Sequence, residues 1–108
     1  MGERVKPGLW IQAQLRRCDI DAIPAVVSRR GDADAGSILL KIARRDGVSV
    51  YAQASGRDGE AGWVRGAGPI GEAEADAYIA RQAKRDPDLW VVEIEDPAGR
   101  YSLDGKIL

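Results

Sequence analysis

Histidine is absent from this chain of 108 residues, and so are threonine, asparagine and phenylalanine. Histidine is the usual general base and the commonest metal ligand in proteins, so its absence excludes Ser-His-Asp hydrolases, Cys-His hydrolases and zinc sites that contain histidine. The chain also has no Walker loop and no dinucleotide-binding fingerprint. We therefore predict no catalytic residue, no metal site and no cofactor.

Cysteine and long hydrophobic runs are also scarce. Cys18 is the single cysteine, so no disulfide can form within the chain. The longest apolar runs, such as residues 38–40, have only a few residues, whereas a helix needs about 20 to cross a bilayer. No apolar segment of signal-peptide length follows the first residues. These features predict a cytoplasmic protein that does not associate with membranes.

Neither sign of charge dominates the chain. It has 16 basic and 17 acidic side chains, which gives a formal net charge of −1. A chain with this balance has no overall field that attracts nucleic acid or anionic lipid. We therefore expect no general affinity for nucleic acid, and any such contact has to come from a local patch.

The remaining composition is that of a globular protein, with 44% hydrophobic and 31% charged residues. A chain of this length can build one hydrophobic core and has no room for a second domain. We expect a single domain over residues 1–108 with no internal boundary.

Two segments have helical patterns. Residues 7–21 carry apolar side chains on one helical stripe: Ile11, Leu15, Cys18 and Ala22. Pro7 suits the first turn of this helix, although apolar residues also alternate over 9–15 and leave a strand open there. Residues 72–85 give the stronger helical pattern, with an acidic first turn, a basic last turn and Pro87 just beyond.

Between the two helices the apolar residues repeat with a period of two, and turn signals recur at short intervals. This pattern predicts an antiparallel meander of four strands, at residues 24–30, 37–44, 48–55 and 61–66. A fifth strand is expected at 89–95, with a short additional segment at residues 101–103. The predicted fold is α+β in the order α-β-β-β-β-α-β, with the meander packed on the helix at 72–85.

The parity of the apolar residues sets the predicted register of the first strands. Pairing Arg30 with Ser37 forms the first hairpin. A three-residue loop then pairs Arg44 with Val48, and it requires a positive φ at Gly47. This register places six apolar residues on one face of the sheet: Ile38, Leu40, Ile42, Val50, Ala52 and Ala54.

A similar turn is predicted at residues 57–59, where Arg-Asp-Gly occurs a second time. It pairs Gln53 with Trp63 and Tyr51 with Arg65. The opposite face of the sheet then carries two aromatic and three cationic residues: Arg30, Lys41, Tyr51, Trp63 and Arg65.

These five residues form the predicted contact surface for a second copy of the protein or for another protein. Aromatic residues and arginine are enriched at interface hot spots, which motivates this interpretation. Alternatively, the first helix or the strand around Trp90 covers the face, and Trp63 is an ordinary core residue.

Three further features could carry chemistry, but each has a simpler structural explanation. Asp32 and Asp34 resemble the start of a calcium loop, yet the closing glutamate is missing and a hairpin loop needs the same residue types. Cys18 follows two arginines but lies on the apolar helical stripe. The acidic residues of 72–76 and 93–96 fit a helix N-terminus and a solvated strand.

Three segments resemble a family of short alphaproteobacterial proteins, the domain of unknown function family 1491. The segments are residues 9–13, 29–42 and 77–96, and the run Asp-Pro-Asp-Leu-Trp-Val-Val-Glu-Ile-Glu within the last of them is fairly specific. The resemblance covers nearly the whole chain. It implies no activity and no catalytic residue.

Three functions fit these observations. A small non-enzymatic module for protein binding or assembly, with a homo-oligomer as one form, agrees best with the missing catalytic groups. An enzyme or enzyme subunit that uses carboxylates or Cys18 is the first alternative. A weak single-stranded nucleic-acid binder, which would stack bases on the aromatic and basic sheet face, is the second.

Overall fold

The computed structural model describes residues 5–55, 61–103 and 105–108. Within these residues there are two helices and six strands, and the strands form one mixed sheet with the order β1-β5-β2-β3-β4-β6. The elements follow the chain as α1 (Pro7–Ile20), β1 (Ala25–Arg29), β2 (Ile38–Arg44), β3 (Gly47–Ser55), β4 (Ala61–Ile70), α2 (Glu72–Arg85), β5 (Trp90–Glu95) and β6 (Lys106–Ile107). The predicted α+β class and element order are confirmed, and β6 lies beyond the predicted extra segment at 101–103.

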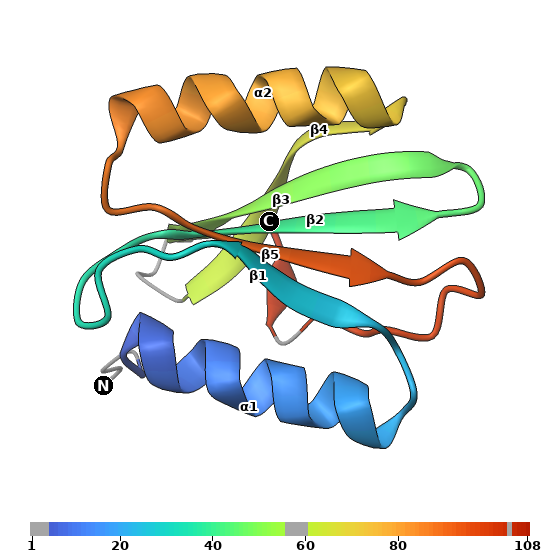
Figure 1. Ribbon diagram of the computed structural model, residues 1–108, viewed down its shortest axis with the longest axis horizontal. Helices are drawn as coiled ribbons and strands as arrows, with labels where there is room; N and C mark the ends of the chain where they lie inside the picture. Colours follow the sequence, from blue (N-terminus) through green and yellow to red (C-terminus); the bar gives the residue numbers. More distant parts are fainter. Residues whose placement is uncertain (1–4, 56–60, 104) are drawn as a thin grey trace.

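The two helices lie on opposite faces of the sheet (Figure 1). The segment at residues 9–15 is helical, and Pro7 occupies the first turn of α1. Helix α2 matches its predicted bounds, with Glu72 and Glu74 in the first turn and basic residues in the last. Neither helix among the described residues is long and apolar enough to span a membrane.

Strand β5 lies between β1 and β2, so the predicted hairpin of Arg30 with Ser37 is wrong. It pairs antiparallel with β1 and parallel with β2, where Ile38 is opposite Trp90. The start of β5 is apolar on both faces, because Trp90, Val91 and Val92 are all buried. Such a strand is stable in the interior of a sheet whose two faces are both covered.

The register of β2 with β3 also differs from the predicted one. Arg44 pairs with Gly47 rather than with Val48, which leaves a two-residue loop. The predicted positive φ at Gly47 is confirmed, at +130°. The predicted register was wrong because it assumed a single apolar face, whereas both faces of β2 are buried, Leu39 on one and Leu40 on the other.

Strands β3 and β4 pair in the predicted register, with Gln53 opposite Trp63 and Tyr51 opposite Arg65. Strand β4 continues to Ile70, past its predicted end at residue 66. The predicted turn at residues 57–59 lies outside the described residues.

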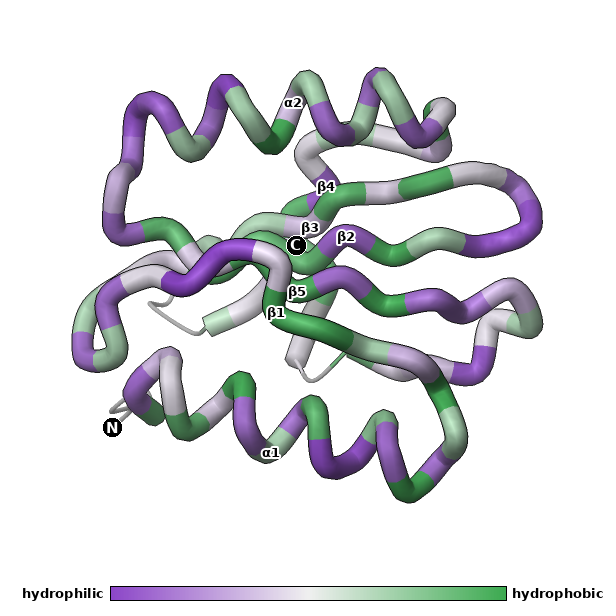
Figure 2. The backbone as a smooth tube through the Cα atoms, in the orientation of Figure 1, coloured by the Kyte–Doolittle hydropathy of each residue, from purple (hydrophilic) through white to green (hydrophobic). Residues whose placement is uncertain are grey.

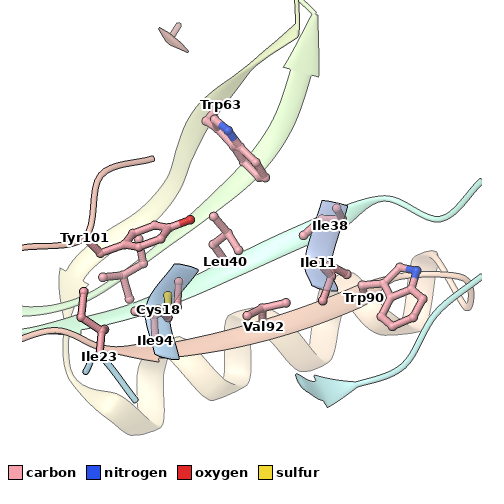
Figure 3. Close-up of a cluster of buried hydrophobic side chains, with 11 residues drawn as sticks. Ile11, Cys18, Ile23, Ile38, Leu40, Trp63, Trp90, Val92, Ile94 and Tyr101 are labelled. Atoms are coloured by element: carbon pink, nitrogen blue, oxygen red, sulfur yellow. The ribbon is translucent and has the colours of Figure 1, made fainter. Parts of the chain in front are cut away.

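The sheet separates two hydrophobic cores. The core beneath α1 contains Ile11 and Cys18 of the helix, whose side chains Figure 3 shows among those of the sheet and of Tyr101. The core beneath α2 is smaller and includes Ala75 of the helix. Six further residues form this second core or its edge: Leu39, Val48, Val50, Ala52, Leu89 and Val91. The predicted packing is therefore corrected, because Ile38, Leu40 and Ile42 face α1 and not α2.

Candidate functional site

The observed fold divides the predicted contact surface. Tyr51, Trp63 and Arg65 share the face that α1 covers, but Trp63 is only 3% exposed. The ring centroid of Trp63 lies 5.3 Å from that of Trp10 in α1. Trp63 is therefore a core residue, whereas Tyr51 is half-buried and Arg65 is exposed.

Lys41 and Arg30 lie apart from these three residues. Lys41 pairs with Val50 of the second core, so its side chain lies on the α2 face of the sheet. Arg30 follows β1, where its guanidinium carbon lies 5.9 Å from the ring centre of Trp90. The five residues do not share one face, because the two-residue loop after β2 shifts the register by one position and places Lys41 on the face opposite to Tyr51. Arg30 lies apart because β5 separates β1 from β2.

Lys41 is a buried cation surrounded by carboxylates. Its Nζ donates hydrogen bonds to Glu72 and to Asp76, the latter at 2.7 Å, and lies 3.5 Å from Glu93. Burial alone would lower the pKa of Lys41, but the hydrogen bonds to Asp76 and Glu72 and the charge of Glu93 together raise it. The ammonium therefore stays protonated and links β2 to α2, and it is unsuited to act as a nucleophile.

A second buried charge, Asp96, follows β5. Its carboxylate accepts hydrogen bonds from Arg44 Nε at 3.1 Å and from the backbone N–H groups of Arg100 at 2.8 Å and Tyr101 at 2.9 Å. Burial alone would raise the pKa of Asp96, but these hydrogen bonds outweigh it and lower the pKa. Tyr101 also donates from its hydroxyl to Gln14 Oε1 at 2.9 Å, so the network connects the C-terminal segment to α1.

The thiol of Cys18 is enclosed by the core beneath α1. The residue is 1% exposed, and burial raises its pKa by more than the charge of Arg17 lowers it. Because the thiolate is the nucleophilic form, this environment suits a small core residue better than a reactive cysteine.

The loop around Asp32 is stabilised by its own side chain. Asp32 Oδ1 accepts backbone hydrogen bonds from Asp34 at 2.8 Å and Ala35 at 3.0 Å. The backbone oxygen of Asp32 also accepts a hydrogen bond from Trp90 Nε1 at 2.7 Å. These contacts fit the interpretation of this loop as a plain turn. Among the described residues, there is no group of three or more side chains that could hold a metal ion.

The outer edge of β1 is the open end of the sheet. In the described part of the chain, β1 pairs only with β5. Glu95 donates its backbone N–H to the carbonyl oxygen of Pro24 at 2.9 Å. Hydrogen-bonded pairs alternate in an antiparallel ladder, so Val26 bonds to β5 while the N–H and C=O groups of Ala25 and Val27 point outward.

A groove of about 560 Å³ lies beside this edge, between the end of α1, the start of β1 and β5. Its apolar lining includes Leu15, Ile23 and Val26, and its charged lining consists of three carboxylates: Asp19, Glu93 and Glu95. Val26 is 58% exposed, although it lies in the middle of a strand. Figure 2 shows β1 as a mainly hydrophobic segment at the end of the sheet.

Sequence reasoning missed this groove. The period-two pattern identified β1 as a strand, but it gave β1 the wrong neighbour and therefore no open edge. The exposed Val26 was the available signal, and it can be recognised only once the strand order is known.

Comparisons with known proteins agree with the fold. A DUF1491 family protein from Caulobacter crescentus CB15 has a crystal structure that matches with a TM-score of 0.87 and 38% sequence identity, over 97% of this chain and 100% of that chain. An NMR structure of a family member from the same organism gives a TM-score of 0.85 and 38% identity, over 99% of each chain. Protein Atu0922 from A. tumefaciens matches with a TM-score of 0.74 and 28% identity, over 86% of each chain.

No curated protein matches the sequence. The family model described as "Protein of unknown function (DUF1491)" matches residues 5–104, which is most of the chain. The match extends from the start of α1 past the Asp96 network and includes the β1 edge. The chain belongs to the DUF1491 family.

Proposed function

We propose that this chain is a small non-enzymatic module that binds an extended protein segment at the outer edge of β1. The observation that carries the proposal is the exposed Val26 in a strand whose outer backbone groups face an apolar and acidic groove. An added strand would pair with the open N–H and C=O groups of Ala25 and Val27, as in other cases of strand addition.

The charges of the groove define the kind of segment that fits. Its charged lining residues are Asp19, Glu93 and Glu95, and no cation lies among the described residues that line it. Glu93 also contacts Lys41, so Asp19 and Glu95 carry most of the unneutralised charge. An extended segment that carries both apolar and basic residues would place apolar side chains near Val26 and cations near these carboxylates.

Other features support a binding role over the alternatives. Cys18 is buried with a raised pKa, and the carboxylates of Glu72 and Asp76 are engaged by Lys41. The proposal retains the cytoplasmic location expected from the sequence, with which the free thiol of Cys18 is compatible.

A synthetic peptide of alternating valine and arginine tests the proposal. We expect the peptide, added to the protein at a concentration low enough to keep the chain monomeric, to slow amide hydrogen exchange at Ala25 and Val27, because their N–H groups become hydrogen-bonded. A matched peptide of alternating valine and glutamate should have no effect, because the groove is acidic. Protection elsewhere, or no protection by the valine–arginine peptide, would contradict the proposal.

The variant Ala25→Pro tests whether the peptide binds through the backbone of β1. It removes one outward-facing N–H and leaves the hydrogen bonds between Val26 and β5 in place, which edge strands tolerate. We expect the variant to keep its fold and to lose peptide binding.

A further inference from the structure

We infer that the segment that binds the edge of β1 is β1 of a second copy of the chain, in an antiparallel two-fold pairing centred on Val26. This inference rests on the proposed function, because it uses the same edge and names its occupant. The resulting dimer would join two sheets into one continuous sheet.

The open backbone groups of β1 match each other in this arrangement. Ala25 and Val27 carry the outward N–H and C=O groups, as the bond from Glu95 to Pro24 requires. A two-fold axis at Val26 places Ala25 of one copy opposite Val27 of the other, and each such pair exchanges two hydrogen bonds. The bulge at Ser28, where the β1–β5 register shifts, ends the open edge after Val27 and favours this register over its neighbours.

The exposed side chains of the edge also complement each other. In the proposed register Val26 faces Val26 of the second copy as a non-hydrogen-bonded pair, the arrangement in which opposing side chains come closest. Val26 is 58% exposed and Ile20, at the nearby end of α1, is 75% exposed. Pairing would bury the two copies of Val26 against each other.

Charge complementarity supports a second copy as the occupant. The N-terminal end of β1 lies beside Asp19 and Glu95, and its C-terminal end carries Arg29 and the exposed Arg30. Figure 2 shows the hydrophilic residues that follow β1 at this end. Antiparallel pairing brings the basic end of each copy to the acidic end of the other, whereas parallel pairing would oppose like charges.

The oligomeric state in solution tests the inference. Sedimentation equilibrium of the full chain should show a mass that rises with concentration from 11.6 kDa toward twice that value. The variant Val26→Asp should remain at the monomer mass, because it places two carboxylates in contact at the two-fold axis. The control Val64→Asp changes another exposed valine of the sheet, in β4, and should dimerise like the unchanged chain.

A charge exchange tests the orientation of the two strands. Arg30→Glu and Asp19→Arg should each weaken the dimer, and the double variant should recover most of the loss because the opposite charges are restored with their positions exchanged. If each single variant weakened the dimer and the double variant weakened it further, the antiparallel pairing would be wrong.

Other results separate this inference from the proposed function. A chain that stays monomeric at its highest soluble concentration, but whose Ala25 and Val27 amides are protected by the valine–arginine peptide, would overturn the dimer and leave the binding edge in place. A dimer that persists in Val26→Asp would also overturn the inference, since its interface would lie elsewhere.

Discussion

Lys41 Nζ lies 2.7 Å from Asp76 Oδ1, and this ion pair joins the middle of β2 to α2. The two partners depend on it unequally, because the side chain of Lys41 is 4% exposed and that of Asp76 is 58% exposed. Loss of the carboxylates would leave an uncompensated positive charge in the interior, whereas loss of the ammonium would leave carboxylates that water can solvate.

Variants of this ion-pair cluster should therefore differ in stability. We expect the double variant Glu72→Gln, Asp76→Asn to lower the free energy of unfolding by about 3 kcal/mol, because the buried ammonium loses the two negative charges that compensate it. Lys41→Met should stay within about 1 kcal/mol of the unchanged chain, since an apolar side chain of similar length fills the same space. Urea denaturation measures both, and a larger loss in Lys41→Met would contradict the prediction.

Asp96 should give the protein an acid-sensitive contribution to stability. Its pKa is lower in the folded chain than in the unfolded chain, where an aspartate has a pKa of about 3.9. The ionised carboxylate therefore stabilises the fold above that pH, and the contribution is lost as the pH falls through the folded pKa. Asp96→Asn should lower the free energy of unfolding at pH 7 by about 2 kcal/mol and weaken its dependence on pH below about 4.

Denaturation of Asp96→Asn at several pH values measures this effect. Glu95→Gln is the matched control, because Glu95 is the exposed neighbouring carboxylate. If the free energy of unfolding fell equally steeply at low pH in Asp96→Asn and in the unchanged chain, the carboxylate of Asp96 would not be responsible.

Truncation of Trp63 should destabilise the core beneath α1. We expect Trp63→Ala to cost about 3–5 kcal/mol, because it removes a buried side chain that contacts Trp10. Arg65 lies two residues further along β4 in the same predicted surface and is exposed, so Arg65→Glu should change the free energy of unfolding by no more than about 0.5 kcal/mol. Thermal unfolding of the two variants tests the contrast, which a stable Trp63→Ala chain would contradict.

Cys18 should be inert in the folded protein. Its burial and raised pKa keep it in the protonated form, so reaction with a thiol-specific disulfide reagent near neutral pH should be slow. The rate should rise sharply when urea unfolds the chain. Rapid labelling without denaturant would show that the thiol is accessible, and it would revive Cys18 as a candidate nucleophile.

The sequence predicts those parts of the fold that depend on local pattern. Helix α2 has its propensity, terminal charges and apolar stripe in agreement, and its bounds are as predicted. The pairing of Gln53 with Trp63 and the positive φ of Gly47 are also as predicted, although the loop before β3 has two residues and not the three on which the Gly47 prediction was based. In these cases the deciding residues lie close together in the chain.

The parts that could not be predicted depend on residues distant in sequence. Nothing near Arg30 indicates that Val91 will be the neighbour of β1, because β5 enters the sheet after the chain has crossed over through α2. The sequence predicts Lys41 in a contact surface, because its carboxylate partners on α2 and β5 are distant in the chain and come close to it only in the folded structure. The open edge of β1 was missed for the same reason.

The position of β5 also limits the order in which the strands can pair during synthesis. Strand β1 emerges early during synthesis, but its only partner among the described strands ends at Glu95. Until the ribosome has released that segment, β1 and the face of α1 that packs on the sheet have no completed surface to join. Strand β1 therefore joins the sheet only after β5 has been made, whereas the pairing of β2, β3 and β4 with one another needs no later segment.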